Sequence, residues 1–190
     1  MKRRDQVRAD ASDYAGFGWG VIPGSVWDGS RFTQGHMNIP TPGLIPIMLS
    51  GRTLREPQEV WSWWSVAPYA VLTRVGEDFD VLTAPISLVR ATLELDDSII
   101  SSCPIIVTPA KEQARLLVRT GSRLRWELRA LSGVSYIPGG TLMPLPPTIE
   151  AGGAHEWWVS PSKCSYMPGK AGAVQAALAS AVGLAPGRRW

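Results

Sequence analysis

Glycine and proline interrupt this sequence so often that a bundle of long helices is not expected. The 190 residues include 19 glycines and 16 prolines, and both residue types destabilise the interior of a helix. Apolar residues still make up 45% of the chain, which is enough to form a hydrophobic core and argues against global disorder. We therefore expect one folded domain of ordinary size, with or without tails.

The termini and the cysteines give a first expectation about location. Lys2, Arg3 and Arg4 are not followed by the apolar segment of a secretion signal, and no window reaches the roughly 18 uninterrupted apolar residues that a membrane helix requires. The two cysteines, Cys103 and Cys164, are too few for a disulfide scaffold. These features predict a cytoplasmic protein without a membrane partner. The net charge of +3 permits nucleic-acid binding but does not require it.

The alternation of apolar runs and turn residues predicts more strands than helices. Strands are expected over residues 18–23, 69–75, 79–84, 103–108, 114–120 and 155–159. Helices are expected over residues 58–65, 86–95 and 170–182. The turn Gly76-Glu77-Asp78 predicts that the strands on either side of it pair as a hairpin. Residues 124–131 fit a strand or a helix equally well, and the mixture indicates an α+β or α/β class.

The two ends of the chain differ in composition from its middle. Residues 1–13 are polar and basic and fit an N-terminal arm or a short helix. Residues 14–183 form the expected domain, whose last element is the amphipathic helix over 170–182. Residues 184–190 form a basic tail.

Five short motifs follow one another in a particular order. They are Gly18 to Pro23, Trp63-Trp64 with Pro68 to Val71, Phe79 to Pro85, Pro104 to Pro109, and Gly139 to Pro147 with Trp157-Trp158. Together they resemble the N-terminal domain of bifunctional DNA primase/polymerases, the prim-pol fold of archaeo-eukaryotic primase type. The resemblance implies a single α+β domain with an RRM-like, mainly antiparallel sheet and flanking helices.

The resemblance also shows where the family's chemistry should lie. The family transfers nucleotides with two metal ions, which an Asp-x-Asp pair and a third carboxylate hold, and a His contacts the incoming phosphates. The positions of the Asp pair correspond here to Leu82 and Ala84, or to Thr83 and Pro85 in the neighbouring register. The His position corresponds to about Ala114, and the third carboxylate position falls at Val134, Ser135 or Tyr136.

None of these residues supplies the hard oxygen ligands that a divalent cation prefers. We therefore expect no catalytic residues, no metal site and no cofactor, and interpret the chain as a pseudoenzyme. The form Asp80-Val81 to Pro85 is similar to that of degenerate, actinobacterial-like members of the family.

Other polar residues give weaker signals. Asp78 and Asp80 are spaced like a metal-binding pair, but they precede the strand, so a solvated turn is favoured over a displaced metal site. His155 beside Glu156 could act as a general base, although a surface histidine is the favoured interpretation. Cys103 is interpreted as a core residue and Cys164 as a loop thiol. No Gly-x-Ser-x-Gly motif of a serine hydrolase occurs.

The basic segment after residue 110 is the strongest binding signal. It contains Lys111, Arg115, Arg119, Arg123, Arg125 and Arg129, which could hold phosphates. On a strand, Arg115, Leu117 and Arg119 would share one face. Adjacent Trp157 and Trp158 would point to opposite faces of a strand, so one of them is a candidate for base stacking or for anchoring a partner. The favoured interpretation is nevertheless that the arginines are spread over two surface strands and serve solubility, and contact with an acidic protein is a further alternative.

These observations predict a catalytically inactive, primase/polymerase-like protein that binds nucleic acid. The alternative is a protein–protein adaptor or regulator that reuses the fold, with an exposed Trp as its anchor.

Overall fold

The computed structural model describes residues 3–48, 50–95, 98, 101–110 and 112–183. Lys111 and the predicted basic tail over 184–190 therefore lie outside the described residues. The fold class is α+β, as predicted, with helices and antiparallel sheets in the same chain. The chain divides into two compact units, Met1–Arg74 with Gly140–Glu156 and Val75–Gly139 with Trp157–Trp190. Each unit is described by itself.

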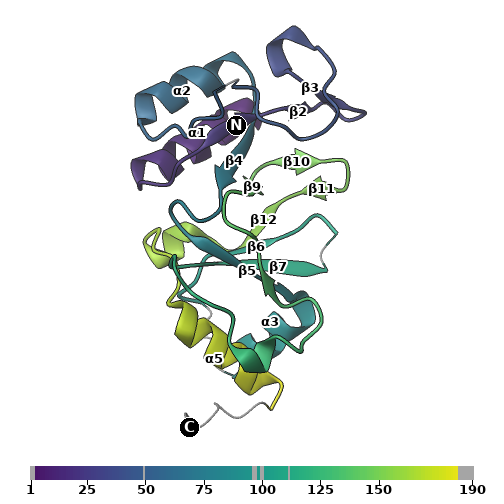
Figure 1. The fold of residues 1–190 in the computed structure, drawn as a ribbon. Helices are drawn as coiled ribbons and strands as arrows, with labels where there is room; N and C mark the ends of the chain where they lie inside the picture. The colour runs from purple at the N-terminus through teal and green to yellow at the C-terminus, as the bar shows by residue number, and fades with distance from the viewer. Residues whose placement is uncertain (1–2, 49, 96–97, 99–100, 111, 184–190) are drawn as a thin grey trace. The chain divides into compact units, whose positions relative to one another are not determined.

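The first unit packs two helices beside a small antiparallel sheet (Figure 1). The sheet has the order β1 (Ile22–Gly24), β4 (Ala70–Arg74) and β9 (Leu142–Leu145). The helices are α1 (Arg3–Gly16) and α2 (Pro57–Val66). The remaining elements are the pairs β2 (Val26–Trp27) with β3 (Phe32–Thr33) and β10 (Ile149–Glu150) with β11 (Gly153–Ala154), and the 3₁₀ turn η1 (Gly35–Met37).

Helix α2 forms where the sequence predicts it. Pro57 occupies the first turn, where its missing N–H has no partner to lose. Val60 and Trp64, four residues apart, are its buried residues, and the indole Nε1 of Trp64 donates to the carbonyl oxygen of Tyr69 at 2.8 Å. A buried Trp needs such an acceptor, so this bond connects the helix to the strand that follows.

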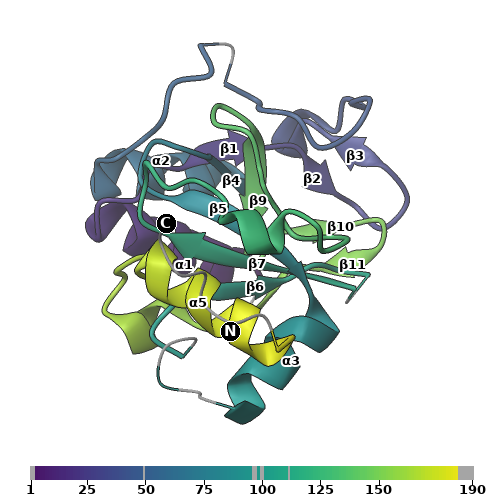
Figure 2. The ribbon, with the colours of Figure 1, turned by 60° about the horizontal axis from the view of Figure 1, so that its bottom comes forward.

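The second unit is built on a five-stranded sheet. Its order is β12 (Glu156–Val159), β6 (Ile105–Val107), β7 (Gln113–Val118), β5 (Asp80–Pro85) and β8 (Ser135–Tyr136). Strand β7 pairs antiparallel with both β5 and β6. Helices α3 (Ile86–Leu95) and α5 (Ala171–Ala181) lie together on one side of the sheet (Figures 1 and 2). The 3₁₀ turns are η2 (Trp126–Leu128) and η3 (Pro161–Cys164).

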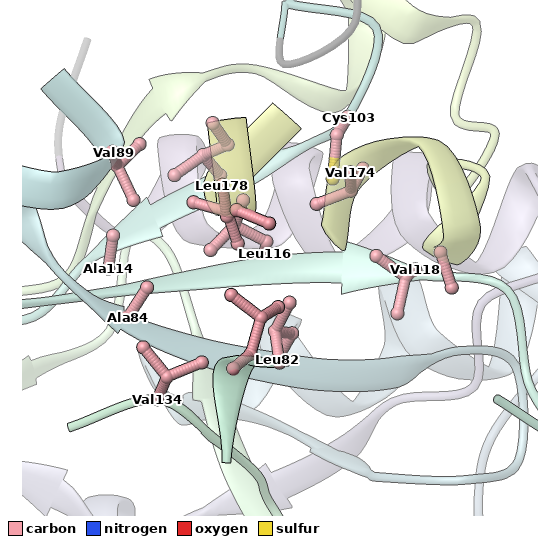
Figure 3. Close-up of a cluster of buried hydrophobic side chains, with 14 of the residues drawn as sticks. Leu82, Ala84, Val89, Cys103, Ala114, Leu116, Val118, Val134, Val174 and Leu178 are labelled. Carbon is pink, nitrogen blue, oxygen red and sulfur yellow. The ribbon is translucent and has the colours of Figure 1, made fainter. Parts of the chain in front are cut away.

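The core of this unit lies between the sheet and the two helices. Alternate residues of a strand point to the same face, and Leu82, Leu116 and Val118 meet Val174 and Leu178 of α5 there (Figure 3). All five side chains are almost completely buried. The predicted C-terminal amphipathic helix is therefore confirmed, and its apolar stripe seals this face of the sheet.

The predicted hairpin across Gly76-Glu77-Asp78 is wrong. The turn itself forms, with the N–H of Gly76 donating to the carbonyl of Phe79 at 2.8 Å. Its two strands nevertheless belong to different sheets, because β4 pairs with β1 and β9 whereas β5 pairs with β7 and β8. Strand pairing depends on which distant apolar strands complete each buried face, and a local turn does not determine that.

Three smaller differences concern segment ends. Residues 124–131, which fit strand or helix, form only the short turn η2. The expected arm or helix over residues 1–13 is helix α1, which continues to Gly16. Strand β5 spans residues 80–85 instead of the predicted 79–84 and ends at Pro85.

We predict that Leu178→Ala lowers the free energy of unfolding by about 2–5 kcal/mol, because it leaves a cavity in the core. Leu95→Ala on α3 is the matched control, since Leu95 is 68% exposed, and a change within about 0.5 kcal/mol is expected there. Urea denaturation of both variants gives the comparison. Equal losses would show that α5 does not seal the core.

A second prediction concerns Cys103, whose thiol is completely buried in the same core. Burial raises the pKa of Cys103 from 9.0 to about 12. Below pH 9 the thiol is neutral in both states, so its contribution to stability is complete. As the pH rises from 9 toward 12, the unfolded thiol ionises first and that contribution is lost. The unfolding free energy should therefore fall more steeply above pH 9 in the native protein than in Cys103→Ala, and parallel slopes would contradict this.

Candidate nucleic-acid interface

The structure separates Arg115 from the other arginines of the predicted basic segment. Its neighbours Ala114 and Leu116 belong to the core beneath α3 and α5, so Arg115 projects from the opposite face of β7. There it lies in register with Thr83 of β5 and Ile106 of β6. Arg119 follows the last residue of β7 and lines a different cavity. Arg115 and Arg119 thus do not form the shared surface that the strand periodicity suggested, and Leu117 between them is fully buried.

A cavity of about 360 Å³ surrounds the exposed part of Arg115. Its described lining residues are Thr83, Thr108, Gln113, Arg115, Gly133, Ser135 and Ile137, of which none is acidic. The hydroxyl of Thr83 lies 3.0 Å from both the carbonyl oxygen and the hydroxyl of Ser135. The cavity therefore combines hydroxyl groups with one guanidinium, which is a donor set for an anion.

Of the four residues at which the resemblance places the metal-binding carboxylate pair, Thr83 lines this cavity. Thr83 faces it, whereas Leu82 and Ala84 of the other register are fully buried beneath the helices. Ser135, one candidate position for the third carboxylate, pairs directly with Thr83 across the two strands. The structure thus brings these positions together and fills them with neutral side chains. Ala114, at the His position, is buried in the core.

The other polar candidates have structural partners. A carboxylate oxygen of Asp80 accepts from the backbone N–H groups of Gly121 and Ser122, at 2.9 and 3.4 Å. Asp80 therefore connects the start of β5 to the turn after β7. Within the described residues, no three His, Cys, Asp or Glu side chains are grouped so that they could hold a metal ion.

The interpretation of His155 as a surface residue is wrong. His155 is only 3% exposed, and its Nε2 lies 2.8 Å from a carboxylate oxygen of Glu150. Its partner is thus Glu150, across the β10–β11 turn, and not the adjacent Glu156. Cys103 is buried as predicted, and Cys164 is half-buried at the end of η3.

The principal concentration of exposed basic and aromatic side chains follows β7. Arg123, Arg125 and Trp126 line a cavity of about 470 Å³ together with Ser122, Glu127, Gly172 and Gln175. Trp126 is 71% exposed, so most of this residue is accessible to a ligand. We call Arg123, Arg125 and Trp126 the Trp126 surface.

Gln175 of α5 holds the backbone of the Trp126 surface in place. Its side-chain oxygen accepts from the N–H of Arg125 at 2.7 Å, and its Nε2 donates to the carbonyl of Arg123 at 3.1 Å. Nε2 also lies 3.1 Å from the hydroxyl of Tyr136, and burial raises the pKa of that tyrosine. Gln175 itself is buried. A loop without regular structure is thereby fixed to a helix.

Arg123, Arg125 and Arg129 differ in whether a carboxylate neutralises their charge. The guanidinium of Arg125 donates to the buried carboxylate of Glu127 at 3.0 Å, which partly neutralises it. Arg123 is exposed. Arg129 is also exposed, and its Nε donates to the carbonyl of Leu124 at 3.4 Å. Arg123 and Arg129 are therefore the arginines best placed to meet phosphates here.

A second basic cavity, of about 520 Å³, lies beside the first turn of α5. Arg119, Lys163 and Lys170 line it, and we call it the Lys163 cavity. Lys170 immediately precedes α5, and Gly172 in the first turn of α5 lines the cavity of about 470 Å³ at the Trp126 surface. The two basic features are thus neighbours.

The tryptophans that the sequence offered as anchors do not belong to the Trp126 surface. Trp157 and Trp158 are both half-buried in β12, and Trp158 packs against the core beneath α3 and α5. Trp126 was not singled out from the sequence, because a Trp is most often a core residue. The available signal was its position between Arg125 and Glu127, in the segment that fits neither a strand nor a helix.

A scan against protein-family models found no match to the chain, and searches of the curated proteins and of the solved structures found none either. The resemblance to primase/polymerase domains therefore remains a prediction. None of the helices among the described residues is long and apolar enough to cross a membrane.

We predict that Gln175→Leu accelerates hydrogen exchange at the Arg125 amide and lowers stability by about 1–3 kcal/mol, because buried polar groups lose their partner. Gln175→Glu is the matched comparison, since it keeps an acceptor for that amide and replaces the donor to Arg123 with a carboxyl oxygen. Exchange at Arg125 should stay slow in Gln175→Glu. Equal protection in both variants would show that Gln175 does not hold this segment.

Proposed function

We propose that this protein binds single-stranded nucleic acid through the Trp126 surface, and that it is a catalytically inactive relative of primase/polymerase domains. The observation that carries the binding proposal is an indole ring, 71% exposed, beside two arginines on a segment fixed to a helix. An exposed aromatic ring beside cationic side chains is the pattern by which proteins hold unpaired bases and their phosphates.

The preference for a single strand follows from the geometry of stacking. A base can stack on Trp126 only when it has left its neighbours in a duplex, and unpaired strands offer such bases without an unstacking cost. Arg123, which lines the same cavity, and Arg129, which follows η2, would contact neighbouring phosphates. Because these contacts are electrostatic, we expect the affinity to fall as the salt concentration rises.

The proposed loss of catalysis is supported by the residues that face the Arg115 cavity. Thr83 and Ser135 are neutral, and Arg115 lies in register with Thr83. A divalent cation would meet a positive charge there and find no carboxylate ligand. This cavity is therefore suited to anions and not to the two metal ions of nucleotidyl transfer.

The adaptor alternative would use the same exposed ring. Trp and Arg are the residue types that contribute most to protein interfaces, so Trp126 could insert into a pocket of a partner protein. The arginines favour nucleic acid, because most of the charge around the ring is positive. A partner captured at high salt, without any affinity for oligonucleotides, would instead support the adaptor.

We predict that Trp126→Ala weakens binding of a fluorescein-labelled single-stranded oligonucleotide by at least about fivefold, because stacking contributes about 1–3 kcal/mol per base. Trp61→Ala is the matched control, since Trp61 is 47% exposed in the first unit, and its affinity should equal that of the native protein. Fluorescence anisotropy measures both. Equal effects of the two substitutions would contradict the proposal.

The salt dependence separates the role of charge from that of stacking. Arg123→Gln should reduce the slope of log K against log salt by about 0.7, the value for one phosphate contact on a single strand, whereas Trp126→Ala should leave the slope unchanged.

A parallel primer-extension reaction with manganese and nucleotides should yield no product. Extension would show that the proposed loss of catalysis is wrong.

A further inference from the structure

Binding along the Trp126 surface does not explain the concentration of positive charge in the Lys163 cavity. Arg119, Lys163 and Lys170 all line one concavity of about 520 Å³. None of the three makes an ion pair with a described residue, and no acidic residue is among the described residues that line the cavity. Like charges gathered in a concave site repel each other and raise the local concentration of anions.

The positions of these cations are fixed by the backbone. The N–H of Arg119 donates to the carbonyl of Gly169 at 2.9 Å, and the N–H of Gly169 donates to the carbonyl of Leu117 at 2.9 Å. These bonds join the end of β7 to the residue before Lys170, so Arg119 and Lys170 are brought together by a rigid connection. The backbone from which these two side chains extend is therefore held in place, although the side chains themselves are exposed.

A glycine permits this connection. A Cβ at Gly169 would lie 2.8 Å from the Cβ of Cys103 and 2.9 Å from its sulfur, closer than such atoms approach in folded proteins. Cys103 is completely buried in the core and cannot move aside. The segment that carries Lys170 can therefore lie against β7 only because residue 169 has no side chain.

Lys163 comes from a third segment that is also held in place. It lies in η3, and the thiol of Cys164 beside it donates to the carbonyl of Ser101 at 3.4 Å. Ser98 and Ser102 complete the polar part of the lining. The cavity thus presents cationic groups and hydroxyls from separate parts of the chain.

We propose that the Lys163 cavity binds a phosphate monoester, that is, a terminal phosphate group and not a phosphate within a strand. A monoester carries about −1.5 to −2 charges near neutral pH and has three free oxygens, whereas an internal phosphodiester carries one charge and has two. Converging cations and hydroxyls suit the first better, and a concavity admits a chain end more readily than a continuous strand. Either the end of a nucleic-acid strand or a free phosphate compound offers this chemistry. Where the source is a strand end, this inference rests on the proposed function, because the strand would reach the cavity from the neighbouring Trp126 surface.

The test compares labelled oligonucleotides of one sequence with a 5′-phosphate, a 3′-phosphate or hydroxyls at both ends, bound to the full chain. We expect one phosphorylated form to bind about tenfold more tightly than the hydroxyl form, as for a hydrogen-bonded charged group. Lys163→Gln should remove this preference and leave the affinity for the hydroxyl form unchanged. Arg90→Gln, which removes a charge from an exposed position on α3, should keep the preference and serves as the control.

Inorganic phosphate distinguishes the two sources of the ligand. In an NMR titration with inorganic phosphate, the amide resonances of Lys163 and Ala173 should shift. Such shifts would support the site even if no oligonucleotide binds, provided that they are absent in Lys163→Gln and absent with chloride at equal ionic strength. Equal affinity for all three oligonucleotides together with no response to phosphate would overturn the inference. In that case strand binding that depends on Trp126 would still stand, so failure of the cavity and failure of the proposed function are distinguishable.

Discussion

Strand β7 is the element on which the second unit depends. It pairs with β5 and with β6, and its alternate residues Ala114, Leu116 and Val118 form the part of the core that α5 covers. The packing of these side chains fixes the register, because a shift by one residue would turn them away from α5 and place Arg115 in the core instead. The same constraint decides where the charges lie. Arg115 must face away from the helices, and Arg119 must leave the strand beside the first turn of α5.

Hydrogen bonds with Asp80 and with Gln175 of α5 give the irregular loop after β7 a defined conformation. After the strand ends, residues 121–131 contain no regular element except η2. Two polar side chains compensate for this. Asp80 binds the N–H groups of Gly121 and Ser122, and Gln175 binds the backbone of Arg123 and Arg125. Polar side chains that satisfy a loop backbone in this way restrict its conformations, so the backbone that carries the exposed Trp126 has a defined position.

The sequence predicted local features better than distant relationships. Helix α2, the amphipathic helix α5 and most strands were predictable, because apolar spacing and Pro57 act within a few residues. The hairpin prediction failed because the partners of β4 come from residues 22–24 and 142–145, which no local turn indicates. The basic segment was visible as a row of arginines, but its division into two cavities and a surface required the sheet register and α5. Lys163 and Lys170, far along the chain, could not be assigned to it from spacing alone. The exposure of Trp126 follows from the same absence of regular structure that left residues 124–131 undecided.

The proposed binding of phosphates without nucleotidyl transfer depends on the positions of Arg115 and Arg119 relative to strand β7. A carboxylate introduced at residue 83 would lie in register with Arg115, and the guanidinium would compete with divalent cations for it. Metal-dependent transfer uses carboxylates to collect cations, which in turn hold phosphates. Here the cations belong to the protein itself, at Arg115 on one face of β7 and at Arg119 beyond its end. Such groups attract phosphates directly, but they do not supply the activated oxygen that the reaction needs. In the proposed relationship to primase/polymerase domains, hydroxyl groups beside a guanidinium stand where that family has carboxylates, and such groups favour anions over metal ions.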